Sequence, residues 1–201
     1  MRVLVTYFAP FGTDTENASA LAVRLLPEEL PGAELRKIQL PVAFQEAEQV
    51  LENAIRKFSP DLVLCTGQAE GAAELHLERV AINLRDARMP DNQGFAPEET
   101  PVYAGGPAAC FAAIPVKQLA KRLRESGIPA AVSCSAGTFV CNDVMYTLLR
   151  LLSQLPGNPM GGFVHVPLTP RQAAGRAVSV PSMASETAAE GLTVMIRELT
   201  R

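Results

Sequence analysis

The chain has 201 residues, 48% of them hydrophobic and 19% charged, and a formal net charge of −3. This is the composition of an ordinary soluble protein, and we expect one domain over residues 1–201 with a sizeable core. No run of Lys or Arg stands out, so nucleic acid is not an expected partner, and the longest apolar runs are too short to span a bilayer.

The four cysteines lack the spacing of a secreted disulfide framework, and a chain of this size does not need covalent staples. The N-terminal Met1–Val5 stretch is typical of a first core strand, because no small-residue cleavage site follows it. We therefore expect reduced thiols and a cytoplasmic location. With two histidines and neither Cys-x-x-Cys nor His-Glu-x-x-His, no metal site is expected, and no other cofactor motif stands out.

The first third of the chain alternates between strand and helix patterns. A helix is expected to be capped near Asn17 or Ser19, to turn Leu21, Leu25 and Leu26 inward and to end at Pro27. The other predicted elements are strands at 2–8, 34–40 and 61–67 and a helix at 44–58. This alternation is typical of an α/β sheet with a largely parallel core.

The pattern changes after residue 70. Residues 75–83 are predicted to be extended, and residues 84–106 form a long irregular excursion of the kind that is often functional. The remaining predicted elements are a helix from Pro115 to Ser126, a strand at 128–132, a helix at 144–152, a strand at 162–167 and a terminal helix at 181–199.

The stretch from Ser133 to Asn142 is a strand-turn-helix junction, with Gly137 free to adopt the backbone conformation that a turn needs. Cys141 is then placed in or near the first turn of a helix. The unpaired N–H groups and the helix dipole there favour an anion, and the thiolate is the nucleophilic form of cysteine. The alternative is that Cys141 is a small buried hydrophobic residue.

A nucleophilic Cys141 needs a base, and His165 is the better of the two histidines. We expect its strand to run beside the strand that enters the Cys141 junction, with the Pro167 stop placing it at a carboxyl edge, where ligands gather. The alternative is a histidine satisfied within the core. His76 is interpreted as structural.

A third group should orient the imidazole. Glu78 is favoured because it shares a predicted strand face with Val80 and Ile82, where a carboxylate without a task is unexpected. Four alternatives remain open on spacing alone: Glu74, Asp86, Asp91 and Asp143.

Two further features stand at predicted loops. The Gly67–Gly71 segment follows a strong strand and could hold a ligand, but it contains no phosphate-binding motif. Phe11 and Phe139 are apolar residues in loops of small and polar residues, with core packing as their default interpretation.

Several separated stretches resemble one family, the type I pyroglutamyl peptidases, which are cytoplasmic cysteine peptidases. The specific ones are Gly137-Thr138-Phe139-Val140-Cys141-Asn142 and Glu78-Arg79-Val80-Ala81-Ile82-Asn83. Weaker ones are Phe8-Ala9-Pro10-Phe11-Gly12, Gly67-Gln68-Ala69, Pro90-Asp91-Asn92-x-Gly94 and Phe163-Val164-His165-Val166-Pro167. They follow the family order over most of the chain.

The resemblance implies removal of N-terminal pyroglutamate from peptides by a triad of Glu78, Cys141 and His165. It also implies that Arg88 helps to stabilise the oxyanion. Phe11 and Phe139 would sandwich the pyroglutamyl ring, with Gln68 and Asn17 near its polar edge. The implied fold is a single three-layer α/β/α domain with a twisted, mostly parallel mixed central sheet, and members commonly form homotetramers.

The sequence departs from the family pattern near the binding loops, at Tyr7, Ala9, Ala18, Glu70 and Ala72. Glu70 and Ala72 replace the glycine and arginine of the family's Gly-Gln-Ala-Gly-Gly-Arg. Two other interpretations are open: a nucleoside-phosphorylase-like transferase, for which the Gly67–Gly71 loop lacks a cation, and a catalytically silent binding domain of the same fold.

Overall fold

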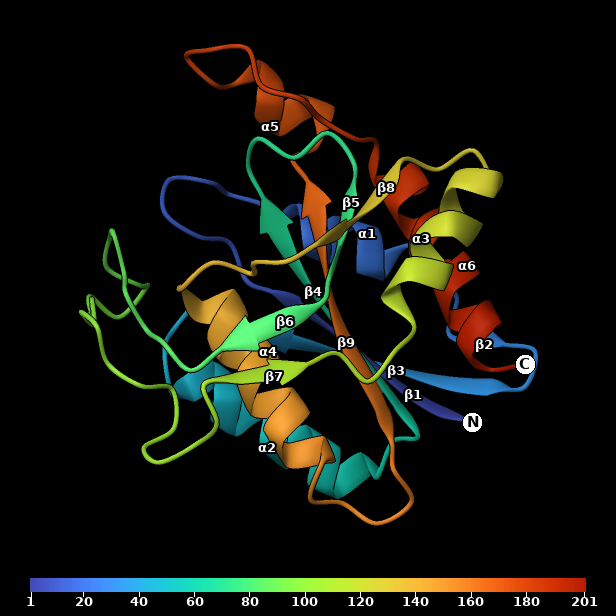
Figure 1. Ribbon diagram of the computed structural model, residues 1–201. Helices are drawn as coiled ribbons and strands as arrows, with labels where there is room; N and C mark the ends of the chain where they lie inside the picture. Colours follow the sequence, from blue (N-terminus) through green and yellow to red (C-terminus); the bar gives the residue numbers. More distant parts are fainter.

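The computed structural model describes residues 1–201, and its centre is a seven-stranded mixed sheet in the order β2-β3-β1-β4-β9-β5-β8 (Figure 1). Strands β1, β3, β4 and β9 run parallel, whereas β5 and β8 are parallel to each other and antiparallel to β9. The strands are β1 (Arg2–Phe8), β2 (Glu29–Leu30), β3 (Ala33–Leu40), β4 (Leu62–Ala69), β5 (Leu75–Glu78), β6 (Val80–Ile82), β7 (Ala109–Phe111), β8 (Ala130–Ser133) and β9 (Met160–Pro167).

Helices cover both faces of the sheet, which gives the expected three-layer α/β/α arrangement (Figure 1). Helices α2 and α4 lie on one face and α1, α3 and α6 on the other. The helices are α1 (Ala18–Arg24), α2 (Glu46–Phe58), α3 (Val116–Glu125), α4 (Val140–Leu152), α5 (Pro170–Ala174) and α6 (Ser185–Leu199). Short α5 belongs to neither layer and projects beyond the carboxyl ends of β4 and β9.

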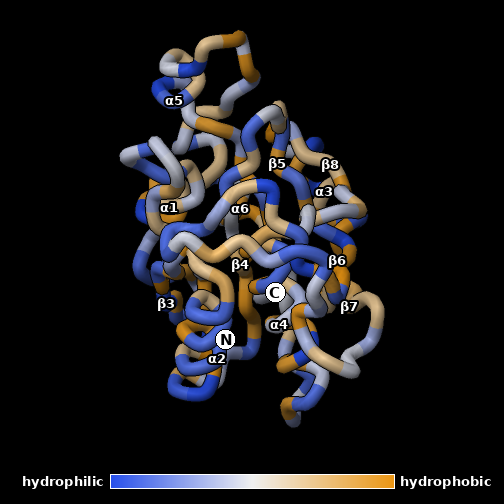
Figure 2. Tube along the Cα trace, turned by 90° about the vertical axis from the view of Figure 1, so that its left-hand side faces the viewer, coloured by the Kyte–Doolittle hydropathy of each residue, from blue (hydrophilic) through white to orange (hydrophobic).

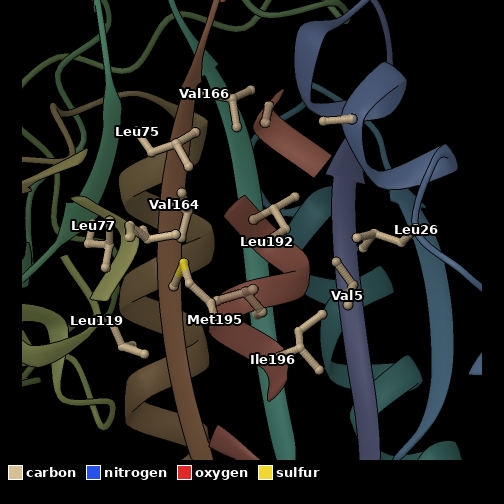
Figure 3. Close-up of a cluster of buried hydrophobic side chains, with 14 of the residues drawn as sticks. Val5, Leu26, Leu75, Leu77, Leu119, Val164, Val166, Leu192, Met195 and Ile196 are labelled. Atoms are coloured by element: carbon tan, nitrogen blue, oxygen red, sulfur yellow. The ribbon is translucent and has the colours of Figure 1, made fainter. Parts of the chain in front are cut away.

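Each layer has its own hydrophobic core. The α1/α3/α6 side is built from alternate residues of the central strands and from α6, with Val5, Val164 and Met195 fully buried (Figure 3). Because β1 and β4 are covered on both faces, they are apolar along almost their whole length rather than alternating. The outer helices are amphipathic instead, and the turns of α2 alternate between hydrophobic and hydrophilic residues (Figure 2).

Most predicted elements are present, and their bounds shift by a few residues. The prediction for α1 was wrong in detail: the helix ends at Arg24, Leu25 is 53% exposed and Leu21 is only half-buried, because the buried face is made by Ala22, Val23 and Leu26. The short elements β2, β7 and α5 were not predicted, because each has five residues or fewer and shows no measurable periodicity.

The expected neighbour of β9 was also wrong. Strand β8, which precedes the Cys141 junction, does not run beside β9, because β5 lies between them and is antiparallel to β9. The predicted extended run 75–83 breaks at Arg79, so Glu78 belongs to the central sheet, while Val80 and Ile82 pair with β7 in a second, two-stranded sheet. Insertion of β5 brings Glu78 into the ladder opposite Phe163.

The segment between β8 and α4 is longer than a tight turn. Residues 134–139 cross from β8 to the start of α4, which lies near the carboxyl ends of β4 and β9 (Figure 1). Gly137 has φ of +78°, a conformation that side chains with a Cβ rarely adopt. This confirms the role expected of that glycine.

All four cysteines are free. Cys65 is fully buried, and burial raises the pKa of its thiol to about 12. Cys134 follows β8 and is exposed. None of the helices is long and apolar enough to cross a membrane.

Candidate active site

Cys141 is the second residue of α4, whose N-cap, Phe139, provides no side-chain hydrogen bond. The first N–H groups of the helix, which adjoin Cys141, therefore have no capping side chain. The sulfur lies directly over β4: a Cβ atom built at Gly67 would be only 2.9 Å from Cys141 Sγ and 2.9 Å from the Phe163 ring. Position 67 must be glycine for the sulfur to reach this place.

His165 lies on β9 beside Cys141 and is 8% exposed. Its Nδ1 is 2.8 Å from Oε1 of Glu78 on β5, which leaves the other side of the ring for the cysteine. Burial alone would disfavour the imidazolium, but the charge and hydrogen bonding of Cys141 and of Glu78 outweigh it and raise the pKa of His165 to about 10. A charged imidazole at neutral pH follows.

Glu78 is 1% exposed, and its Oε2 has no hydrogen-bond partner in the protein. A buried carboxylate with half of its capacity unused is costly, so its contact with His165 is the evident reason for its position. Two of the alternatives are committed elsewhere: Asp143 contacts Arg85 at 2.6 Å, and Asp91 accepts the Phe44 backbone N–H at 2.8 Å. The structure therefore brings Glu78, His165 and Cys141 together.

Asn142 is a residue whose task the sequence did not indicate. Fully buried, it accepts the Ile82 N–H at 2.9 Å and donates to the carbonyl groups of Ile82 and Leu84 at 2.9 and 3.1 Å. This side chain fastens the first turn of α4 to β6 and to the start of the long excursion. The only sequence signal was an amide next to the cysteine.

A buried charged cluster supports the same turn of α4. Arg85 donates from Nε to Asp143 at 2.6 Å and from Nη2 to Glu48 of α2 at 2.7 Å. Burial, reinforced by the Glu48 carboxylate, raises the pKa of Asp143 to about 9, although Arg85 opposes the shift. The protonated form of Asp143 is therefore favoured at neutral pH.

Cys141 and His165 line a cavity of about 570 Å³. Its wall includes Cys141, His165 and four of the five residues expected in ring binding or oxyanion stabilisation, namely Phe11, Asn17, Gln68 and Phe139. A larger hollow of about 690 Å³ lies at the amino ends of the strands, near Pro60 and Pro156, and contains none of the candidate residues. The chemistry therefore belongs to the smaller cavity.

Phe11 and Phe139 contact each other, with ring centroids 5.3 Å apart and planes inclined by 49°. A flat ring held between two aromatic faces needs a centroid separation of about 7 Å, twice the contact distance between carbon atoms. Phe139 also contacts Phe44 edge-on at 5.1 Å. Binding between the two rings therefore requires them to move apart by about 2 Å.

Gln68 and Asn17 line the cavity with side chains that are already hydrogen-bonded within the protein. Gln68 donates to Asp14 at 3.0 Å, and its Oε1 accepts from the Ala18 N–H and from Gln172. Asn17 is the N-cap of α1, as predicted, and its Oδ1 accepts from the Ser19 N–H at 3.0 Å. Neither amide has its whole capacity free for a ligand.

Arg88 is exposed and does not line the cavity, although the adjacent Met89 does. It makes no ion pair or side-chain hydrogen bond. Three charged residues on the cavity wall were not singled out as binding residues from the sequence: Asp14, Glu70 and Arg176. Arg176 follows α5, more than 100 residues from Glu70, and no local pattern could have joined them.

An α/β fold that places a cysteine at a helix N-terminus against a histidine and a buried carboxylate fits the class of cysteine-type peptidases. The family model described as pyroglutamyl peptidase matches residues 1–201. The chain belongs to this family of cysteine-type peptidases.

Individual proteins agree with the family model. The chain is 48% identical to the pyrrolidone-carboxylate peptidase of Thermococcus onnurineus and 46% identical to that of Bacillus licheniformis, covering 98% and 96% of this chain and 98% and 89% of theirs. The crystal structure of pyroglutamyl peptidase I from Bacillus amyloliquefaciens matches with a TM-score of 0.94 at 38% identity, over 99% of this chain and 94% of that one. The predicted fold and family are thereby confirmed.

Proposed function

We propose that this enzyme removes N-terminal pyroglutamate from peptides, with Cys141 as nucleophile, His165 as general base and acid, and Glu78 as the group that orients the imidazole. The observation that carries the assignment is the continuous contact from Glu78 through His165 to Cys141 at the wall of one cavity. The names of the relatives support the choice of substrate.

The chemistry uses only side chains and water. Cys141 Sγ attacks the carbonyl carbon of the pyroglutamyl residue, and His165, charged beside the thiolate, gives its proton to the departing amine. Water, deprotonated by the now neutral His165, then hydrolyses the thioester and restores the cysteine. The oxyanion would be stabilised by N–H groups in the first turn of α4 and by Arg88, which must turn from solvent toward the cavity.

The cavity suits an uncharged lactam. Phe11 and Phe139 offer apolar faces once they separate, and Gln68 and Asn17 lie at the polar side. A substrate with a free α-ammonium group would have to be desolvated between the two phenylalanines, at a cost of several kcal/mol. Pyroglutamate has no such group.

The test is cleavage of a fluorogenic pyroglutamyl amide beside the matching glutaminyl and glutamyl amides. We expect cleavage of the first and at most trace rates on the others. Comparable rates on all three would contradict the pocket as assigned, and no cleavage of any would favour a silent binding domain. A phosphorylase-like transfer is not supported, because the one guanidinium on the cavity wall is held by Asp14 and Glu70.

We also propose that residues 1–201 act as a single catalytic domain, which one continuous sheet supports. A homotetramer is proposed from the family resemblance alone, and a cytoplasmic location from that resemblance and from the four free cysteines. Light scattering during size-exclusion chromatography tests the first, and a mass other than that of four chains would contradict it.

A further inference from the structure

The rim of the active-site cavity carries a cluster of three charged residues that the proposed chemistry does not use. Arg176 donates from both terminal nitrogens to Asp14, at 2.7 and 2.8 Å, and from Nε to Glu70 at 3.1 Å. The cluster joins three segments: the loop after β1, the end of β4 and the chain just after α5. All three residues line the same cavity as Cys141.

The cluster does not balance in charge. The hydrogen bonds from Arg176 hold the pKa of Asp14 below its usual range against the opposing effect of burial, so both members of that pair are ionised at neutral pH. Asp14 meets the guanidinium through two parallel bonds and neutralises it. Glu70 is then the surplus negative charge, with its side chain 52% exposed and its Oε1 without a partner in the protein.

The distance along β4 places this charge relative to the scissile bond. Gly67 lies under the attacking sulfur, and Glu70 is three residues further, about 10 Å away in extended chain. An extended peptide advances about 3.3 Å per residue, and a lysine side chain spans a further ~6 Å. Glu70 is therefore within reach of the side chains of the first two residues after pyroglutamate if the peptide leaves the ring site along this side of the cavity.

We propose that Glu70, supported by the Asp14–Arg176 pair, is a specificity-determining residue that favours peptides with a cationic side chain in the first two positions after pyroglutamate. This inference rests on the proposed function. It concerns a residue at which this chain departs from the family pattern, because the resembling motif has glycine there. The preference is accordingly a property of this chain rather than of the reaction.

The experiment compares kcat/KM for three peptides, pyroglutamyl-Lys-Ala-amide, pyroglutamyl-Gln-Ala-amide and pyroglutamyl-Glu-Ala-amide, at low ionic strength. We expect kcat/KM to be about two- to fivefold higher for the Lys peptide than for the Gln peptide, and higher by a similar factor for the Gln peptide than for the Glu peptide. This is the range of effects that partly exposed charge pairs produce. The ratios should shrink at 0.5 M salt because screening weakens exposed charges.

In Glu70→Gln the three values should converge. Glu29→Gln removes one negative charge from exposed β2, outside the cavity, and should keep the wild-type ratios. Equal rates on the three peptides in the wild type, or unchanged ratios in Glu70→Gln, would overturn the inference. A small pyroglutamyl amide with a neutral leaving group serves as the reference substrate. If the peptide ratios fail but this amide is cleaved, only the inference has failed. If this amide is not cleaved, the proposed function and the inference are overturned together.

Discussion

The proposed reacting groups and the proposed ring-binding residues meet at one cavity, which Cys141 and His165 line together with Phe11 and Phe139, but the two sets are held in different ways. Glu78, His165 and Cys141 come from two central strands and from a helix that packs on the sheet, and they are already in contact. Phe11 and Phe139 come from loops and contact each other where a substrate ring should lie. In the proposed mechanism the groups for bond cleavage are thus preorganised, whereas binding of the ring between the two phenylalanines would require a movement of loops.

The physical reason is the kind of support that each region has. The reacting groups rest on Gly67, on the buried hydrogen bonds of Asn142 and on two apolar cores. The rim of the cavity, which includes the cluster of Asp14, Glu70 and Arg176, is held by polar contacts among partly exposed side chains, such as that between Arg176 and Glu70. Partly exposed polar contacts are individually weak, so the rim can rearrange at low cost.

The largest expected effect comes from the nucleophile. Cys141→Ala should lower kcat by several orders of magnitude while leaving the fold intact, because the sulfur is the nucleophile that attacks the carbonyl carbon of the amide. The measurements are turnover of a pyroglutamyl amide and thermal unfolding. Cys134→Ala is the matched control: its exposed thiol should be dispensable. Substantial turnover by Cys141→Ala would refute the assignment.

The second effect concerns the charge on His165, whose pKa of about 10 lies above the unfolded value. Activity that depends on the imidazolium should persist through neutral pH and fall as pH rises through about 10. Glu78→Gln removes one of the two groups that raise this pKa, so the fall should move to lower pH. pH profiles of kcat/KM measure the shift.

His165→Ala tests the same pair through alkylation. Loss of the cation should slow modification of Cys141 by iodoacetamide at neutral pH by about tenfold, toward the behaviour of a free thiol. Peptide-resolved mass spectrometry follows each cysteine, with Cys134 as internal reference. A Cys141 rate unaffected by His165→Ala would contradict the pairing and leave the helix N-terminus as the activating influence.

The sequence predicted the reacting region better than the rim, for a physical reason. Cys141 and the Gly137 turn lie in one short segment, and His165 is conspicuous within an apolar strand, so local pattern is informative. The pairing of Glu78 with His165 depends on β5 lying between β8 and β9, which no local pattern specifies. Spacing therefore left five carboxylates open, and the family resemblance singled out Glu78.

The rim depends on contacts between distant segments, such as Arg176 with Asp14, which are separated by 162 residues. The sequence indicated Phe11 and Phe139 as apolar residues in polar loops, but the contact between their rings depends on how the two loops pack in the folded protein. Gln68 and Asn17 were expected to face a ligand, yet their hydrogen bonds are shared with Asp14 and Ser19. The hydrogen-bond partners of such side chains are set by tertiary structure.

Asn142→Ala should weaken the support of the reacting region. It leaves the partly buried Ile82 N–H and two carbonyl groups without their partner, at a cost of about 2–4 kcal/mol in unfolding free energy. We expect kcat to fall with little change in KM, because the first turn of α4 loses its attachment. Denaturant unfolding and steady-state kinetics measure both, and a raised KM with unchanged kcat would place Asn142 in binding instead.

Phe11→Ala should act on the rim alone. The substitution removes one wall of the proposed ring site, which weakens binding. It also removes the Phe11–Phe139 contact that closes this site, which favours binding. We expect KM to rise by about tenfold with kcat changed less, the pattern of a lost binding contact. A large fall in kcat with KM unchanged would show instead that Phe11 acts on the transition state.

The smallest effect concerns the pH dependence of stability that comes from the buried cluster of Arg85, Asp143 and Glu48. The pKa of Asp143 is raised to about 9 in the folded protein, above the 3.8 of an ordinary carboxyl. Between these values the folded state binds a proton that the unfolded state does not, so this residue makes stability decrease as pH rises. Asp143→Asn mimics the protonated form and lacks that dependence.

Asp143→Asn should accordingly unfold at nearly the same temperature as the wild type near pH 4. It should unfold several degrees higher near pH 9. Thermal unfolding at a series of pH values provides the test, with Glu29→Gln as a control for the change in net charge. Parallel curves for Asp143→Asn and wild type would mean that Asp143 is already ionised against Arg85 at neutral pH. The reacting region would then rest on a buried charge pair rather than on a protonated carboxyl group.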